Sequence, residues 1–103
     1  MTTTTSLNLK NLAERLAKAT RASAVILFGS HASHTPHPDS DVDVLYVVPD
    51  DTDLLAIAEE AERLFYPRPV PLDLVPMHES HWQRGASVLA RIVKQEGIVL
   101  YGA

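Results

Sequence analysis

The segment that decides the fold runs from residue 27 to residue 45 and reads LFGSHASHTPHPDSDVDVL. It starts inside the apolar run AVILF at 24–28, whose length and β-branched content predict a strand buried on both faces and ended by Gly29. It finishes inside DVDVLYVV at 41–48, which predicts a second strand. Residues 30–40 predict a connecting loop that could open with one helical turn at Ser30.

Three helices are predicted outside this segment, because apolar residues recur at three- and four-residue steps. They cover 9–17, 54–65 and 82–93. The candidate N-caps are Ser6 or Asn8 for the first helix and Asp51, Thr52 or Asp53 for the second. The third helix is expected to end at Gly97 as its C-cap.

Two short strands complete the pattern. VPLDLVP at 70–76 predicts a third strand, and Pro71 places it at a sheet edge or at a strand start. IVLY at 98–101 predicts a final strand. The chain therefore predicts an α/β fold, layered in the α+β sense, with a small mixed β-sheet flanked by helices in one domain over 1–103.

The composition excludes several classes of protein. The formal net charge of -4 argues against direct nucleic-acid binding, and the absence of cysteine excludes thiolate metal sites and disulfides. No apolar run approaches a membrane span, and MTTTTSLNLK is not a signal peptide. We expect a cytoplasmic protein with no membrane association, whose residues 1–6 are disordered.

Three aspartates stand inside apolar strands. Asp41 and Asp43 are one residue apart, so they share one face of the second predicted strand. Asp73 stands between two leucines in the third strand and joins them if the two strands are neighbours. Three carboxylates could then hold one or two Mg²⁺ ions for phosphoryl or nucleotidyl transfer. A structural alternative stays open, because Asp41 could simply follow Ser40 at a turn.

Gly29 and Ser30 are the candidate phosphate-binding residues. Glycine lets a phosphate approach the backbone closely, and a helical turn opening at Ser30 would direct N–H groups at an anion. For Gly-Ser alone, a plain strand-ending turn remains the alternative.

The combination resembles a known signature. Leu27-Phe28-Gly29-Ser30, then ten residues, then Asp41-Val42-Asp43, is similar to the GS-x10-D-x-D pattern of the DNA polymerase β-like nucleotidyltransferase superfamily. The acid in PLDLV falls where that family has its third aspartate, and the ending EGIVLYG resembles the small prokaryotic members. These are the minimal nucleotidyltransferase (MNT) proteins, antitoxin partners of HEPN-domain toxins. The resemblance covers the chain from about Leu9 to Tyr101.

The resemblance implies a polymerase β-like fold and a role for each matching residue. Gly29 and Ser30 would bind the triphosphate of ATP, and Asp41 and Asp43 would bind Mg²⁺. Asp73 would complete the metal site and act as, or position, the general base. The chain would be an ATP-dependent protein adenylyltransferase that transfers AMP to a tyrosine of a HEPN-domain toxin, as a homodimer or a hetero-oligomer with its partner.

Two other functions remain open. The family usually continues Gly-Ser as Arg-x-Arg-Gly, whereas this chain has His31, Ala32, Ser33 and His34. Because neutral histidine cannot replace a bidentate arginine, an antitoxin that neutralises the toxin by binding is one alternative. A subunit that transfers nucleotides to a small molecule, such as an aminoglycoside, is another.

Histidines, basic residues and the tryptophan near the C-terminal end of the sequence are predicted to have structural roles. The histidine pair His78 and His81 is expected to serve as surface or capping residues rather than as a zinc site. Trp82 is expected to belong to the apolar stripe of the last helix, which would also carry Arg84, Arg91 and Lys94.

Overall fold

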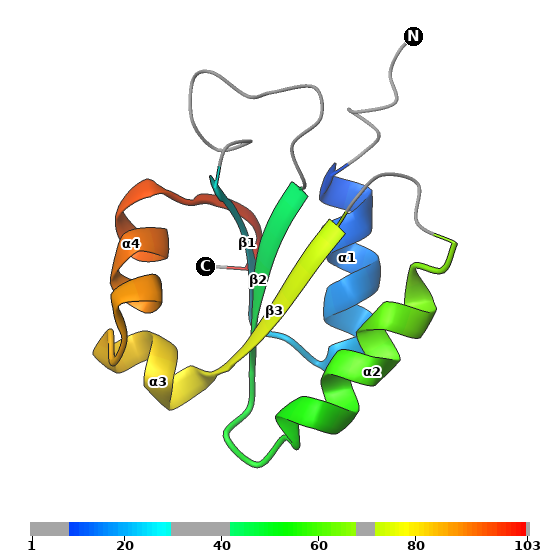
Figure 1. Ribbon diagram of the computed structural model, residues 1–103, viewed down its shortest axis with the longest axis horizontal. Coiled ribbons are helices and arrows are strands. Elements are labelled where there is room, and N and C mark those ends of the chain that lie inside the picture. The colour runs from blue at the N-terminus through cyan, green and yellow to red at the C-terminus, as the bar shows by residue number, and fades with distance from the viewer. Residues whose placement is uncertain (1–8, 30–41, 68–71, 103) are drawn as a thin grey trace, which may run out of the picture.

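The computed structural model describes residues 9–29, 42–67 and 72–102 (Figure 1). These residues form helices and strands in the predicted order, except that two helices stand in place of the predicted last one. The elements are α1 (Leu9–Thr20), β1 (Ala24–Phe28), β2 (Val42–Val48), α2 (Leu54–Leu64), β3 (Leu72–His78), α3 (Glu79–Arg84), α4 (Val88–Glu96) and β4 (Ile98–Gly102).

The four strands form one mixed sheet in the order β3-β2-β1-β4. β1 runs antiparallel to both β2 and β4, whereas β2 and β3 run parallel. The second and third strands are therefore neighbours, which is the condition under which Asp73 was expected to join Asp43. β3 is an edge strand, one of the two positions that Pro71 indicated.

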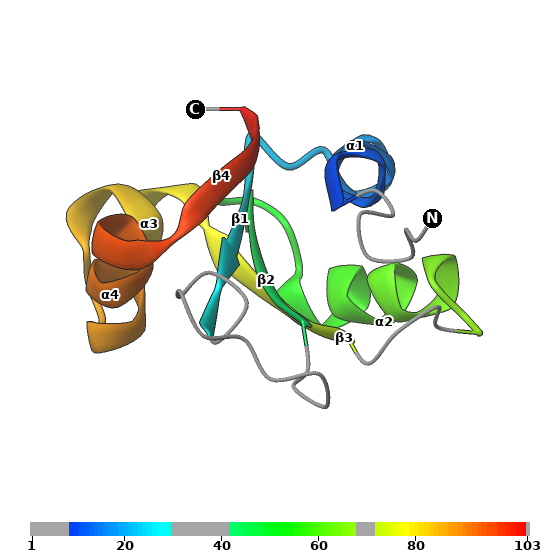
Figure 2. The same ribbon diagram turned by 90° about the horizontal axis from the view of Figure 1, so that it is seen from above.

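Helices cover both faces of the sheet, with α1 and α2 on one side and α3 and α4 on the other (Figure 2). Strand side chains alternate between these layers. Val42, Val44 and Tyr46 enter the cluster under α1 and α2, whereas Leu45 and Val47 enter the cluster under α3 and α4. The central strands are thus buried on both faces, which explains their continuous apolar sequences.

The β2–α2–β3 unit positions the acidic residues. Because β2 and β3 are parallel, both begin at the same end of the sheet, and β1 ends there as well (Figure 1). α2 forms the crossover, and Asp53 is its N-cap, with its carboxylate accepting hydrogen bonds from the N–H groups of Leu55 and Ala56 at 3.0 and 3.2 Å. Asp53 is one of the three predicted caps.

The prediction of one long last helix was wrong, because the chain forms two helices there. Gly85 adopts a left-handed conformation with φ of 58° and ends α3, and its N–H donates to the Trp82 carbonyl at 3.2 Å. Ser87 then caps α4 by accepting a hydrogen bond from the Ala90 N–H at 3.2 Å. Arg84 consequently lies on α3 rather than beside Arg91 on α4.

Other boundaries differ in detail. β3 continues two residues beyond Pro76, to His78, because an edge strand tolerates a residue without an N–H group. Gly97 is the C-cap of α4, as predicted. The candidate caps Ser6 and Asn8 and the predicted loop at 30–40 lie outside the described residues. In the described ranges no helix is both long and apolar enough to cross a bilayer.

Candidate active site

Three side chains form a row across three strands at one end of the sheet. Phe28 of β1 pairs with Asp43 of β2, and Asp43 pairs with Asp73 of β3. All three lie on the α3 and α4 side, since Ile26 and Leu45, two residues along on β1 and β2, belong to the cluster on that side. Neighbouring strands are about 4.8 Å apart, so the two carboxylates are adjacent.

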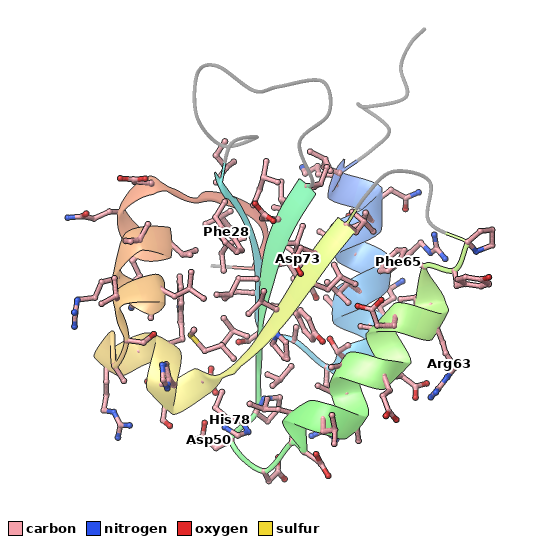
Figure 3. All side chains as sticks on the ribbon, in the orientation of Figure 1. Phe28, Asp50, Arg63, Phe65, Asp73 and His78 are labelled. Carbon is pink, nitrogen blue, oxygen red and sulfur yellow. The ribbon has the colours of Figure 1, made fainter. Side chains whose placement is uncertain are left out.

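This row marks the end of the apolar sheet face. The next row along the strands is Ile26, Leu45 and Val75, in which Ile26 and Leu45 are buried. Exposure increases across the first row, from half-buried Phe28 and Asp43 to exposed Asp73. Figure 3 shows Phe28 and Asp73 near this end of the sheet and Asp50 and His78 near the opposite end. The acids are thus anchored by a packed core and remain accessible from one side.

Gly29 makes room for the carboxylate of Asp43. Its φ is +79°, a conformation that side chains rarely adopt. A Cβ at this position would overlap Asp43 Oδ2 and lie 3.1 Å from Asp43 Cγ. Glycine is therefore favoured here for two reasons, the backbone conformation and the space that the Asp43 carboxylate occupies.

The buried neighbours of the acids hold them in register. Val42 and Val44 flank Asp43 and are 6% and 0% exposed, and Leu72 and Leu74 flank Asp73 and are 5% and 8% exposed. A shift of one residue would turn these apolar side chains to the α3 and α4 face and would bury the aspartates in the cluster under α1 and α2. The packing energy of the α1 and α2 side therefore fixes the position of the carboxylates on the other side.

The pair of carboxylates fits a divalent cation. Like charges directly opposite on neighbouring strands repel, and a cation between them removes that repulsion. Oxygen donors are the ligands that Mg²⁺ prefers, and Mg²⁺ is commonly held by one or two carboxylates plus phosphate oxygens.

The other predicted site residues, Ser30 and Asp41, lie outside the described residues. Within the described ranges, no group of three or more His, Asp or Glu side chains could hold a metal ion. The described part of the site therefore supplies two of the three predicted carboxylates, together with Gly29.

The histidines and basic residues near the last helices have structural contacts. The Nε2 atom of His78 lies 2.8 Å from the Thr52 carbonyl oxygen. The ammonium of Lys94 lies 4.8 Å from the centre of the Trp82 ring, and the guanidinium of Arg91 donates to the Gly85 carbonyl at 3.2 Å. Trp82 packs against the cluster under α3 and α4, as predicted for a core residue.

The paired carboxylates identify this site, whereas the surface hollows of the described residues lie elsewhere. A hollow of about 260 Å³ lies between Thr20, Arg21 and Asp51, and another of about 460 Å³ lies on α4 beside Val88 and Ile92. Neither is lined by the acidic pair. Asp43 is half-buried and Asp73 is exposed on the sheet face.

The fold and the acidic pair define a class of protein, and comparison with known families agrees. The sequence model of the nucleotidyltransferase domain family matches residues 9–100. This chain therefore belongs to the nucleotidyltransferase domain family. No curated protein sequence matched it significantly.

Similar solved structures come from toxin–antitoxin complexes. A chain of a toxin–antitoxin complex with AMP-PNP is 30% identical, with a TM-score of 0.68, over 92% of this chain and 74% of that one. A chain of the toxin–antitoxin MntA–HepT is 27% identical, with a TM-score of 0.60, over 91% and 70% of the two chains. A chain from the complex of a tri-AMPylated Shewanella oneidensis HEPN toxin with its MNT antitoxin is 25% identical, with a TM-score of 0.57, over 95% and 70%. These neighbours are consistent with the MNT group.

Sequence reasoning overlooked how Phe28 and Gly29 relate to the acids. Both residues were visible in the motif, but their contact with Asp43 depends on the register of β1 against β2. A long connection between two strands does not set that register, as a short hairpin turn would.

Proposed function

We propose that this chain is a Mg²⁺-dependent nucleotidyltransferase that transfers AMP from ATP to a tyrosine of a HEPN-family toxin and thereby acts as an antitoxin. The observation that carries the proposal is the pairing of Asp43 with Asp73 beside Gly29. Support for the donor and acceptor comes from the similar structures, one with AMP-PNP and one with an AMPylated HEPN toxin.

Each residue has a defined role in the proposed reaction. Gly29 and Ser30 bind the triphosphate, and Asp41, Asp43 and Asp73 bind the metal. Bound Mg²⁺ would supply positive charge to the phosphates. Asp73, the exposed member of the pair, accepts the proton of the tyrosine hydroxyl or orients that hydroxyl. The phenolic oxygen forms a bond to the α-phosphorus. The bond between the α-phosphorus and the oxygen that bridges it to the β-phosphate breaks, and pyrophosphate leaves.

A second candidate function is an antitoxin that acts by binding alone. The observation that favours it is the sequence His31–His34, in place of the arginines that follow Gly-Ser in similar proteins. Without a fixed positive charge beside the triphosphate, donor binding is weaker. Both functions involve the same partner, in a hetero-oligomer, and differ in whether the toxin is modified.

Labelling separates the two functions. The protein is incubated with Mg²⁺, ATP labelled at the α-phosphate and a lysate of its own host, in which the HEPN-domain protein is first shown by mass spectrometry to be present and unmodified. We expect label on that protein, and none with Asp41→Asn/Asp43→Asn. Asp51→Asn is the matched control, since Asp51 is exposed and lies beyond the opposite end of β2.

The outcomes of this experiment discriminate clearly. Full transfer by the double variant would refute the metal assignment. Absence of label with the natural protein, together with recovery of the partner in a pull-down, would establish the binding antitoxin instead.

A further inference from the structure

We infer that Phe28 is a positioning residue for the metal-binding carboxylate of Asp43, an inference that rests on the proposed function. Phe28 is the apolar end of the row that continues through Asp43 to Asp73. Residues directly opposite on antiparallel strands have Cβ atoms about 4.5–5.5 Å apart, so the ring and the carboxylate are neighbours on one face.

Among the described residues, Gly29, Leu45 and Phe28 lie around the carboxylate of Asp43. The missing side chain of Gly29 provides the space that Oδ2 occupies at the rim of the sheet. Leu45, two residues along on the same face, is fully buried and closes the inner side. Phe28 stands on the β1 side, where it packs against the cluster under α3 and α4. Asp73 lies on the β3 side of Asp43.

The ring has two physical effects on the carboxylate. It occupies volume on the β1 side of Asp43, next to the space at Gly29 in which Oδ2 lies, and therefore limits the rotation of the carboxylate away from that position. It also excludes water from one side of the carboxylate, and a less polar surrounding strengthens the attraction between a carboxylate and a cation. Removing the ring should therefore weaken metal binding beyond any effect on stability.

Three variants test this role. Phe28→Ala removes the ring, and Phe28→Leu keeps most of the apolar volume. Leu89→Ala is the matched control, because Leu89 is also a partly buried residue packed against the same cluster, but it lies on α4 outside the acidic row. All three proteins are compared with the natural protein by thermal unfolding in EDTA.

The decisive measurement is the affinity of each protein for Mn²⁺, determined by electron paramagnetic resonance. α,β-Methylene ATP is present so that no transfer occurs. Phe28→Ala is expected to raise the Kd about tenfold, a typical effect of losing a residue that orients a metal ligand. Phe28→Leu should stay within about threefold, and Leu89→Ala should leave the Kd unchanged. If Phe28→Ala does not fold, a larger Kd for Phe28→Leu than for Leu89→Ala decides the question in favour of the inference.

Two results would overturn the inference, and they are distinguishable. Equal Mn²⁺ affinities for the Phe28 variants and for Leu89→Ala would show that the ring serves only the core, while the proposed function stands. Failure of the natural protein to bind Mn²⁺ would refute the metal site itself.

Discussion

Gly29→Ala is the most informative substitution in the candidate site, because it perturbs the backbone and the acidic pair at once. The added Cβ would overlap Asp43 Oδ2, and the backbone would keep a φ of +79°. A residue other than glycine in the left-handed region costs about 1–2 kcal/mol. For a domain of this size, 1 kcal/mol lowers the unfolding midpoint by about 4–8 °C. We therefore expect a folded protein that melts at a clearly lower temperature.

The effect on transfer should be larger than the effect on stability. Displacing the carboxylate by about 1 Å can reduce a reaction rate about a hundredfold. Gly85→Ala provides the matched control, because Gly85 also has a positive φ, of 58°, but the new Cβ would lie 3.3 Å from the flexible Arg91 side chain. Gly85→Ala should lose about as much stability through its backbone and keep its activity.

The assay combines calorimetric unfolding with initial rates of AMP transfer, measured well below both melting temperatures. A Gly29→Ala protein that transfers AMP within about threefold of the natural rate would refute the argument that this space must hold Asp43. Equal losses of activity in Gly29→Ala and Gly85→Ala would show that general destabilisation, and not the acidic pair, explains the effect.

Four further predictions concern stability. Within the described residues the hydroxyl of Tyr46 is buried without a hydrogen-bond partner, so Tyr46→Phe should raise the free energy of unfolding by about 1 kcal/mol in urea titrations at pH 7. Burial raises the pKa of Tyr46 to about 12, above that of the unfolded chain, so the natural protein should lose stability from pH 10 to 12 and Tyr46→Phe should lose less. Asp53→Ala should cost about 0.5–2 kcal/mol in urea unfolding through loss of the α2 cap, and an equal loss in Asp51→Ala would contradict the cap assignment. A hydrogen bond from the Ser80 N–H lowers the pKa of Asp50, so the ionised carboxylate stabilises the folded state. This stabilisation is lost as the pH falls through the lowered pKa. The unfolding midpoint of Asp50→Asn should therefore vary less between pH 5 and 3 than that of the natural protein.

Much of the fold could be predicted because local sequence determined it. The apolar residues at 24–28 and at 42–48 each specify a strand because nearly all of them are buried. The division of the last helix into α3 and α4 could not be predicted from spacing alone. The apolar residues from Trp82 to Val93 keep a helical spacing across the residues that separate the two helices. Gly85 and Ser87 were the available signals, a C-terminal glycine followed by an N-cap.

The candidate site depended on information that spacing does not contain. The position of Asp73 beside Asp43 follows from the parallel pairing of two strands that a helix separates. Sequence indicated which residues were acidic and which face each would occupy, but not which strand would be the neighbour. The contact of Phe28 with Asp43 likewise follows from pairing across the segment 30–41.

The paired register of β2 and β3 also limits how the length of this chain can change. Because side chains alternate along a strand, deleting one residue between Asp43 and Val48 would turn the acid into the apolar cluster under α1 and α2, whereas deleting two would return it to its own face. Insertions inside the strands should therefore survive only as even numbers, a restriction that does not apply to the residues between β2 and α2. Active members of this family should therefore differ in the length of these strands by even numbers of residues.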